Sequence, residues 1–315
     1  MPDYIHNDAE FRSLLAIVSA HQGIDITLVE KDYWITHALY ALKMQGFDFA
    51  LKGGTSLSKG FGLIDRFSED IDIRVFTNFG LRTEGNEDRP RVREGRKLFY
   101  DELSRRIKIP GISSIERDYA FDDIDKYRSG GIRLFYETNT PYLEDLKPGI
   151  LLEAGFDNIT PNSPLNITSW IHEYLEKSGL AGEYIDNRAS EIKCYHPGYT
   201  LIEKIQTIIR KFRNLKDGIH DMNFMRQYYD VYCLLGNENV VSFIDTDAYK
   251  VHKKQRIKGS DASIPVAIHP ALLLNDEVIL SKMKDRYRAT SKLYYKGQPP
   301  FEDLLKRIQC YLDIL

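Results

Sequence analysis

Lys-Gly-Gly-Thr-Ser-Leu-Ser-Lys-Gly-Phe-Gly-Leu-Ile-Asp-Arg-Phe-Ser-Glu-Asp-Ile-Asp-Ile-Arg-Val-Phe, residues 52–76, is the stretch around which the rest of the chain is organised. Gly53 and Gly54 allow the backbone to turn so that successive N–H groups point outward, because glycine tolerates conformations that other residues avoid. Thr55 and Ser56 can then cap a short helix. A turn of this kind predicts a phosphate-binding cradle.

Two carboxylates follow this turn on one predicted strand. Asp70-Ile71-Asp72 begins sixteen residues after Gly54, and strand alternation places both carboxylates on one face and the isoleucines on the other. Neighbouring carboxylates repel each other unless a cation lies between them, and their oxygens suit Mg²⁺. A magnesium pair beside a phosphate cradle indicates phosphoryl or nucleotidyl transfer.

A third carboxylate, Glu153, interrupts the apolar run of residues 149–156. Burying a lone carboxylate is unfavourable unless it is paired or bound to a metal. We therefore expect Glu153 either to belong to the site or to face solvent on an edge strand. Asp123-Ile124-Asp125 repeats the Asp-x-Asp pattern between strand-like runs with no glycine turn before it, so we expect an ordinary turn there.

The composition is that of an ordinary globular protein, with 43% hydrophobic and 28% charged residues in a chain of 315. We expect a cytoplasmic protein, because no stretch approaches a membrane span and the N-terminus lacks a signal-peptide pattern. Three separated cysteines argue against a disulfide framework or a cysteine-rich zinc site. The net charge of −3 divides into about −8 for residues 1–199 and about +5 for the remainder. That asymmetry is compatible with a polyanionic acceptor such as RNA, and also with ordinary solvated surface.

Apolar spacing predicts the main elements. We expect helices over 8–21, 27–42 and 200–210, and Thr27 with Glu30 and Thr200 with Glu203 have the pattern of capping boxes. Strands are expected over 49–52, 114–121, 131–137 and 149–156. The polar residues 78–97 are expected to form a mobile loop over the site, with a helix from about Glu94 to Ile107.

Several pieces of the chain, in order, match one known pattern: Glu30-Lys31-Asp32-Tyr33-Trp34, Gly53-Gly54-Thr55-Ser56, Arg66-Phe67-Ser68 with Asp70-Ile71-Asp72, Leu201-Ile202-Glu203-Lys204-Ile205, and the aromatic run 224–235 with Arg226 and Asp230. Over about residues 28–235 the sequence thus resembles nucleotidyltransferases of the DNA-polymerase-beta superfamily, and within it the abortive-infection AbiEii/AbiGii toxins. Gln227 departs from the family pattern, which often has His or Lys there. The resemblance implies an α+β fold, with a nucleotidyltransferase core over 1–195 that contains a mixed or antiparallel sheet, and a helical domain over 196–315.

The resemblance also implies the site. Asp70, Asp72 and Glu153 would be the catalytic and metal-binding carboxylates, with two Mg²⁺ ions as cofactors. The nucleoside triphosphate would contact Lys52, Gly53, Gly54, Thr55, Ser56, Lys59, Arg66, Ser68, Lys204, Arg226 and Asp230. The implied acceptor is RNA, with tRNA as the first candidate, and the implied setting is a toxin–antitoxin pair with a cognate antitoxin and no membrane.

Ordinary structural roles stay open for several of these residues. Lys59 and Lys204 are also consistent with helix-surface lysines, and Arg66 with a tie between its loop and Asp65 or Glu69. Arg226 and Asp230 are spaced as a helix pair. Lys31 and Asp32 either face the nucleotide or are solvated on an amphipathic helix.

Two basic clusters close the chain and bear on the acceptor. They comprise Lys250, Lys253, Lys254, Arg256 and Lys258, and then Lys282, Lys284, Arg286, Arg288, Lys292 and Lys296 with interleaved tyrosines. Such clusters either bind a nucleic-acid backbone or form solvated surface. The rival functions are nucleotide transfer to a protein or small molecule, and a non-catalytic nucleotide-binding toxin that sequesters a partner.

Overall fold

The computed structural model describes residues 2–143, 146–216 and 222–315, and the chain divides into two compact units. Unit 1 comprises Met1–Phe61 and Phe67–Tyr195, and unit 2 comprises Gly62–Arg66 and His196–Leu315. The division expected from the sequence, residues 1–195 and 196–315, does not separate Gly62–Arg66 from the first part. This short segment belongs to unit 2 because its backbone and side chains bond to the helical residues there, as described below.

Unit 1 is built on one seven-stranded mixed sheet with the strand order β3-β4-β5-β2-β1-β7-β6. β2 pairs in parallel with β5 and β1 pairs in parallel with β7, whereas the other neighbours are antiparallel. The mixed α+β fold expected from the sequence is therefore confirmed. The strands are β1 (Phe49–Lys52), β2 (Asp70–Val75), β3 (Ile112–Asp118), β4 (Ser129–Tyr136), β5 (Ile150–Gly155), β6 (Asn162–Ile167) and β7 (Ala189–Tyr195).

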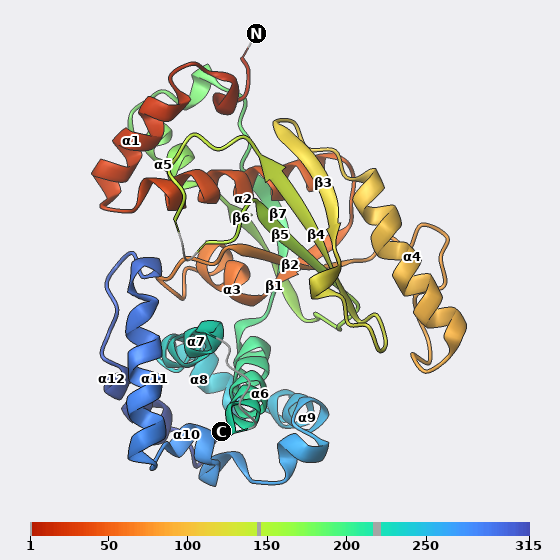
Figure 1. Ribbon diagram of the computed structural model, residues 1–315, viewed down its shortest axis with the longest axis vertical. Helices are drawn as coiled ribbons and strands as arrows, with labels where there is room; N and C mark the ends of the chain where they lie inside the picture. The colour runs from red at the N-terminus through yellow and green to blue at the C-terminus, as the bar shows by residue number, and fades with distance from the viewer. Residues whose placement is uncertain (1, 144–145, 217–221) are drawn as a thin grey trace. The chain divides into compact units, whose positions relative to one another are not determined.

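Helices α2 (Ile26–Met44) and α4 (Pro90–Arg106) cover one face of this sheet (Figure 1). Trp34 of α2 stacks on Tyr136 with ring centroids 5.0 Å apart, and a side chain at Gly130 would overlap the ring of Tyr100 on α4. Gly130 and Tyr136 lie on the same face of β4, because side chains alternate along a strand. The strand register places Ile71 on that same face, so Asp70 and Asp72 lie on the other.

Two of the remaining helices of unit 1, α1 (Phe11–Gln22) and α5 (Trp170–Lys177), pack against α2. The short α3 (Gly53–Thr55) packs against β2 and continues into a π-helical turn over Ser56–Gly60. Nearly every side chain of α2 is buried, including Glu30, Lys31 and Asp32. A helix that is buried all round shows no amphipathic stripe, so the expectation of a solvated face for Lys31 and Asp32 is wrong.

Unit 2 is helical in the part of the chain that the structure describes. Its helices are α6 (Pro197–Lys216), α7 (Arg226–Leu234), α8 (Glu238–Ile244), α9 (Asp247–Arg256), α10 (Pro270–Leu273), α11 (Glu277–Ala289) and α12 (Phe301–Cys310). Arg66 joins this unit through a single β-bridge to Tyr294, and the Tyr295 hydroxyl donates a hydrogen bond of 3.2 Å to the carbonyl of Ile64. Among the described residues, no helix of either unit is long and apolar enough to cross a bilayer.

Several local expectations are wrong at the ends of elements. α4 begins at Pro90, inside the segment expected to be a loop, because Val92, Gly95 and Arg96 are buried against neighbouring residues. Asp25, and not Thr27, caps α2, since its side chain accepts a hydrogen bond of 2.8 Å from the Thr27 N–H. α6 begins at Pro197, so Thr200 lies within the helix and is not its cap. The sequence analysis also missed β6, β7 and α5.

Candidate active site

The glycine turn follows β1 directly and lies against the carboxylate strand. Gly53 has a positive φ of +71°, which favours glycine, and a Cβ atom there would overlap Oδ2 of Asp72. The Thr55 hydroxyl donates a hydrogen bond of 2.5 Å to the carbonyl oxygen of Asp70. Two contacts therefore tie the turn to β2. The expected capping roles of Thr55 and Ser56 are wrong, because Lys52 occupies the N-cap position and Ser56 is buried beside the Cys194 thiol.

The carboxylates lie in a row across two adjacent strands, β2 and β5. Asp72 is directly opposite Lys52 on β1 and opposite Glu153 on β5. Asp70 lies two residues before Asp72 and therefore on the same face. The pairing of β2 with β5 thus brings together carboxylates that are about eighty residues apart in the sequence.

The side chain of Glu153, in this row, has a strongly perturbed pKa. Burial, followed by the negative charge of Asp72, raises the pKa of Glu153 to about 7. The nearby Lys52 ammonium opposes this rise and does not cancel it. A buried carboxylate beside other carboxylates favours either a proton or a cation, so the row has the electrostatic character of a cation site.

We asked whether these residues fit the divalent metal that the family chemistry implies. Carboxylate oxygens are the ligand type that Mg²⁺ prefers, and Asp70, Asp72 and Glu153 supply them on one face. Among the described residues, no three His, Cys, Asp or Glu side chains are already gathered as a metal cage. The donor set therefore fits a cation by chemistry and position, and its side chains have to turn toward one point to hold it.

Lys52 and Lys59 are held by carboxylates of unit 1. The Lys52 ammonium lies 3.0 Å from Asp157, just after β5. The Lys59 ammonium lies 2.6 Å from Oδ1 of Asp32, whose Oδ2 accepts a hydrogen bond of 2.8 Å from the Trp170 N–H. Burial raises the pKa of Asp32, and the Lys59 charge opposes that rise.

Through Asp32, Lys59 therefore connects the turn to the start of α5.

Ser68 is half-buried in the segment before β2.

Three further sequence candidates meet in a second cluster, inside unit 2. The Arg66 guanidinium binds Asp230 through two hydrogen bonds of 2.6 Å, one to each carboxylate oxygen. The Lys204 ammonium lies 2.8 Å from Oδ2 of the same carboxylate. Burial acts to raise the pKa of Asp230, but the charges of Arg66 and Lys204 outweigh it and hold that pKa below its usual range.

This cluster is nearly dry, since the side chains of Arg66 and Asp230 are 3% and 0% exposed and that of Lys204 is 12% exposed. Arg226 is also buried, one turn before Asp230 on α7. The carboxylate that binds Arg66 is thus Asp230, which lies 164 positions further along the chain, and not the Asp65 or Glu69 expected from the sequence.

Two features beside the carboxylates were not expected from the sequence, namely Lys147 and the pairing of Lys31 with Glu69. The Lys147 ammonium lies 3.3 and 3.4 Å from the two oxygens of Asp70. Lys31 and Glu69 form a buried ion pair of 3.3 Å directly next to it. Lys31 and Glu69 lie inside the quoted motifs and were detectable as charges flanked by apolar residues, whereas nothing in the sequence around Lys147 points to a role.

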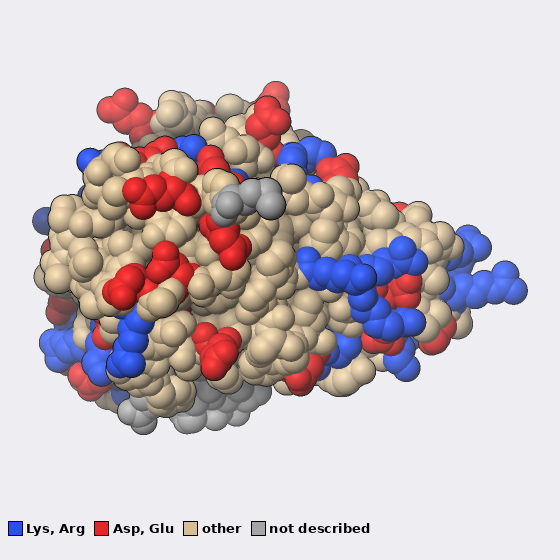
Figure 2. Space-filling view, turned by 90° about the horizontal axis from the view of Figure 1, so that it is seen from above, with Lys and Arg blue, Asp and Glu red and all other residues tan. Residues whose placement is uncertain are grey.

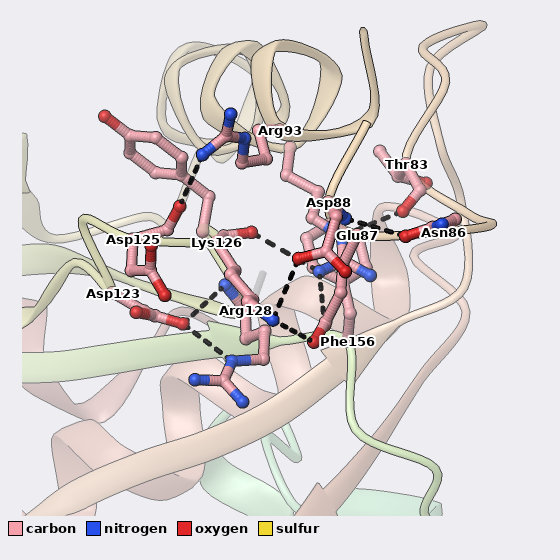
Figure 3. A network of polar contacts seen from close by, with 12 residues as sticks. Thr83, Asn86, Glu87, Asp88, Arg93, Asp123, Asp125, Lys126, Arg128 and Phe156 are labelled. Atoms are coloured by element: carbon pink, nitrogen blue, oxygen red, sulfur yellow. Dashed lines mark hydrogen bonds and ion pairs between the residues drawn. The ribbon is translucent and has the colours of Figure 1, made fainter. Parts of the chain in front are cut away.

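The second Asp-x-Asp pattern is a structural turn (Figure 3). Asp123 accepts a hydrogen bond of 2.8 Å from Arg128, and Lys126 lies 3.3 Å from Glu87 and 3.1 Å from Asp88. Arg93 of α4 donates to the carbonyl of Asp125. These contacts tie the turn to the loop before α4, which confirms the expected turn and explains its carboxylates without a metal.

Basic side chains are unevenly placed. Figure 2 shows Lys and Arg gathered toward the right, the side on which Figure 1 places α4, and Asp and Glu spread toward the left. In unit 2, a pocket of about 380 Å³ is lined by three lysines of α9 and by apolar residues. Its lining residues are Lys250, Lys253, Lys254, Ile257, Ala262, Ile264, Pro265 and Val266. Partial burial lowers the pKa of Lys253.

Comparison with known proteins gives a family and a likeness to solved structures. The family profile described as "Nucleotidyl transferase AbiEii toxin, Type IV TA system" matches residues 38–307. A solved structure described as "Crystal structure of JHP933 from Helicobacter pylori" is 14% identical and covers 92% of each chain, with a TM-score of 0.44. No curated protein matches the sequence.

Proposed function

The chain belongs to the AbiEii nucleotidyl transferase toxin family, and from this premise we propose that it transfers a nucleotide from a nucleoside triphosphate to a hydroxyl group of an RNA, with tRNA as the first candidate. Membership also confirms the resemblance inferred from the sequence and makes the protein a toxin–antitoxin nucleotidyltransferase with a cognate antitoxin as partner. The use of a nucleoside triphosphate, the RNA acceptor and the use of Mg²⁺ are the parts that we propose.

One observation carries the proposal: the glycine turn lies directly against the carboxylate row. Gly53 has no room for a side chain because Asp72 occupies that space, and Thr55 is bonded to the backbone of Asp70. A phosphate bound by the backbone of the turn would therefore lie within reach of Asp70 and Asp72. Binding a nucleotide alone does not need this row of three carboxylates, so the arrangement favours a transferase over a sequestering protein.

The reaction would be an in-line displacement at the α-phosphorus. The acceptor oxygen forms a new bond to the α-phosphorus while the bond to the bridging oxygen breaks, and pyrophosphate leaves with that electron pair. The acceptor hydroxyl loses its proton to a carboxylate, for which Glu153 is our candidate, or to water. When bound at Asp70 and Asp72, Mg²⁺ supplies charge neutralisation for the phosphates and makes the acceptor hydroxyl more acidic.

The chain's own residues have distinct parts in this proposal. The backbone of Gly53 and Gly54 and the Ser56 region would hold the β- and γ-phosphates, and Lys52 would add positive charge at the edge of the row. Lys204 would neutralise triphosphate charge, and Asp230 would position it. Because Lys204 is already bound to Asp230, we expect it to share its ammonium between that carboxylate and the phosphates.

The RNA acceptor is supported by basic surface in unit 2. The pocket beside α9 combines three ammonium groups with apolar lining residues, which suits a backbone phosphate next to a base or ribose. Among the described residues, Lys253 and Lys254 form no ion pair with a carboxylate, so their charges are available to a polyanion.

The decisive experiment is incubation of the purified protein with total cellular RNA and each radiolabelled nucleoside triphosphate in turn. We expect label from one triphosphate to appear in RNA of tRNA size, and to be absent with Asp72→Asn. Label that appears in protein or in a small molecule would replace RNA as the acceptor. No transfer to any of these, with triphosphate binding intact, would favour the sequestering toxin.

A further inference from the structure

Lys147 lies at the carboxylate row but outside every motif that identified the site. It stands three residues before β5, and its ammonium is within 3.3 and 3.4 Å of both oxygens of Asp70. The two side chains are 29% and 25% exposed, so the contact is open to water and to a ligand. An ion pair of this exposure adds little to stability. Its place beside a metal-binding carboxylate suggests a function other than stability.

The backbone of Lys147 is held on both sides by one buried ion pair. Its N–H donates a hydrogen bond of 3.0 Å to Glu69, and its carbonyl accepts one of 2.6 Å from the Lys31 ammonium. Lys31 and Glu69 bind each other at 3.3 Å and are only 2% and 3% exposed. Because Glu69 immediately precedes Asp70, the same pair fixes the start of β2 and the point from which the Lys147 side chain extends.

This arrangement has a consequence for cation binding. An ammonium group and a divalent cation that bind the same carboxylate oxygens repel each other. A cation at Asp70 therefore displaces the Lys147 ammonium. The lysine stem is long and its backbone stays anchored, so the ammonium can turn to a nearby anion without any change in the fold.

We propose that Lys147 is a further active-site residue, which neutralises Asp70 in the nucleotide-free protein and binds a phosphate of the nucleoside triphosphate once a cation takes its place. The inference rests on the proposed function, because it needs a cation at Asp70 and a triphosphate beside it. Lys147 would thereby couple the two ligands: it weakens binding of the cation alone and strengthens binding of the cation together with the triphosphate.

The test is Lys147→Met, studied in the full-length protein with Mn²⁺ as the probe. Titration calorimetry without nucleotide should show Mn²⁺ binding about tenfold tighter than in the wild type, because the competing charge is gone. Binding of the triphosphate in the presence of Mn²⁺ should be about tenfold weaker. Lys147→Arg keeps the charge and should stay close to the wild type in both measurements.

Lys126→Met is the matched control. Lys126 belongs to the same unit, is 27% exposed and is paired with Glu87 and Asp88. Neither binding constant should change in this variant.

Unchanged Mn²⁺ affinity in Lys147→Met would overturn the inference, as would a triphosphate affinity equal to that of the wild type. Failure of the inference and failure of the proposed function are distinguishable through Asp70→Asn. If Asp70→Asn abolishes transfer while Lys147→Met behaves as wild type, only the inference fails. If Asp70→Asn transfers nucleotide normally, the proposed function fails, whatever Lys147 does.

Discussion

The carboxylate row of unit 1 and the Asp230 cluster of unit 2 both contain charged residues of the family motifs, but the electrostatic environments of their carboxylates are opposite. In the row, Asp70, Asp72 and Glu153 are neighbours of the same sign, and the pKa of Glu153 rises to about 7. In the cluster, Asp230 lies between two cations, and its pKa falls below the usual range. Neighbouring charges of the same sign favour a bound cation, whereas a buried charge flanked by opposite charges favours a structural or positioning role.

The largest expected effect is on the row. Asp72→Asn removes a charge that the fold does not need, so nucleotide transfer and growth inhibition should fall about 1,000-fold or more, equivalent to ~4 kcal/mol of transition-state stabilisation. The melting temperature should stay the same or rise, because one repulsive charge is gone. Transfer to RNA is the measurement, and Asp48→Asn, an exposed carboxylate paired with Lys193, is the control. Wild-type activity in both Asp70→Asn and Asp72→Asn would remove the row from the site.

Substitutions in the Asp230 cluster should instead change the stability of the protein. Asp230→Ala leaves the Arg66 guanidinium buried without its carboxylate, which should lower the free energy of unfolding by about 3–5 kcal/mol. Urea unfolding measures the loss. The double variant Arg66→Met/Asp230→Leu should recover part of it, since the buried Arg66 charge is removed together with its partner and only the Lys204 ammonium loses its carboxylate.

Asp65→Ala is the control for this cluster, because its ion pair with Lys296 is exposed, and a change within about 1 kcal/mol is expected. A loss of that small size in Asp230→Ala would mean that the cluster is not structural.

The buried side chain of His37 extends the comparison to a neutral group, because a positive charge on its ring would be uncompensated. His37 bonds to the carbonyl of Pro110 at 3.0 Å and to the Asn187 amide at 3.1 Å, which fits a neutral ring that donates to one and accepts from the other. Burial lowers the pKa of His37 to about 4 from 6.5. As the pH decreases from 6.5 to 4, the unfolded chain therefore binds a proton at this histidine and the native protein does not. The free energy of unfolding decreases by roughly 3 kcal/mol over this range.

His37→Gln should remove that part of the pH dependence, measured as the slope of unfolding free energy against pH from 7 to 4. His21→Gln, at an exposed position on α1, should leave the slope unchanged. An unchanged slope in His37→Gln would show that the pKa of His37 is the same in the native and the unfolded protein.

Substitutions at two glycines can distinguish the effect of backbone strain from the effect of a contact with the carboxylate row. Gly46 and Gly53 have φ values of +79° and +71°, but a Cβ atom meets open space at Gly46 and Asp72 at Gly53. Gly46→Ala should therefore lose about 1 kcal/mol of stability, and Gly53→Ala about 2 kcal/mol together with most of the transfer activity. Equal stability losses with full activity in both variants would show that the turn tolerates a side chain beside Asp72.

The smallest effects are expected at the α9 pocket, where charge is exposed to solvent. Lys253→Glu/Lys254→Glu should weaken RNA binding modestly and reduce the slope of log affinity against log salt by about 2, because two phosphate contacts are lost. Triphosphate binding should not change. Lys177→Glu/Lys306→Glu makes the same charge change at exposed positions elsewhere. If both double variants behave alike, the pocket is not a specific RNA contact.

Much of the fold was predictable from local patterns. The glycine turn, the Asp70–Val75 strand and the helix that contains Asp230 follow from residue spacing, because turns, strands and helices have fixed periods. The start of α4 was not predictable in this way, since Pro90 begins a helix whose polar residues include the buried Arg96. β6 and β7 were missed because their pairing to each other and to β1 gives them their place in the sheet.

The closeness of the glycine turn and the two aspartates was predictable from the sequence, because both belong to one short stretch of chain. The partners of the other charged residues depend on the tertiary structure. The pairing of Arg66 with Asp230 and of Lys147 with Asp70 joins residues far apart in the chain. Whether a charge is solvated, paired or uncompensated depends on burial and on its neighbours in space, and sequence spacing records neither.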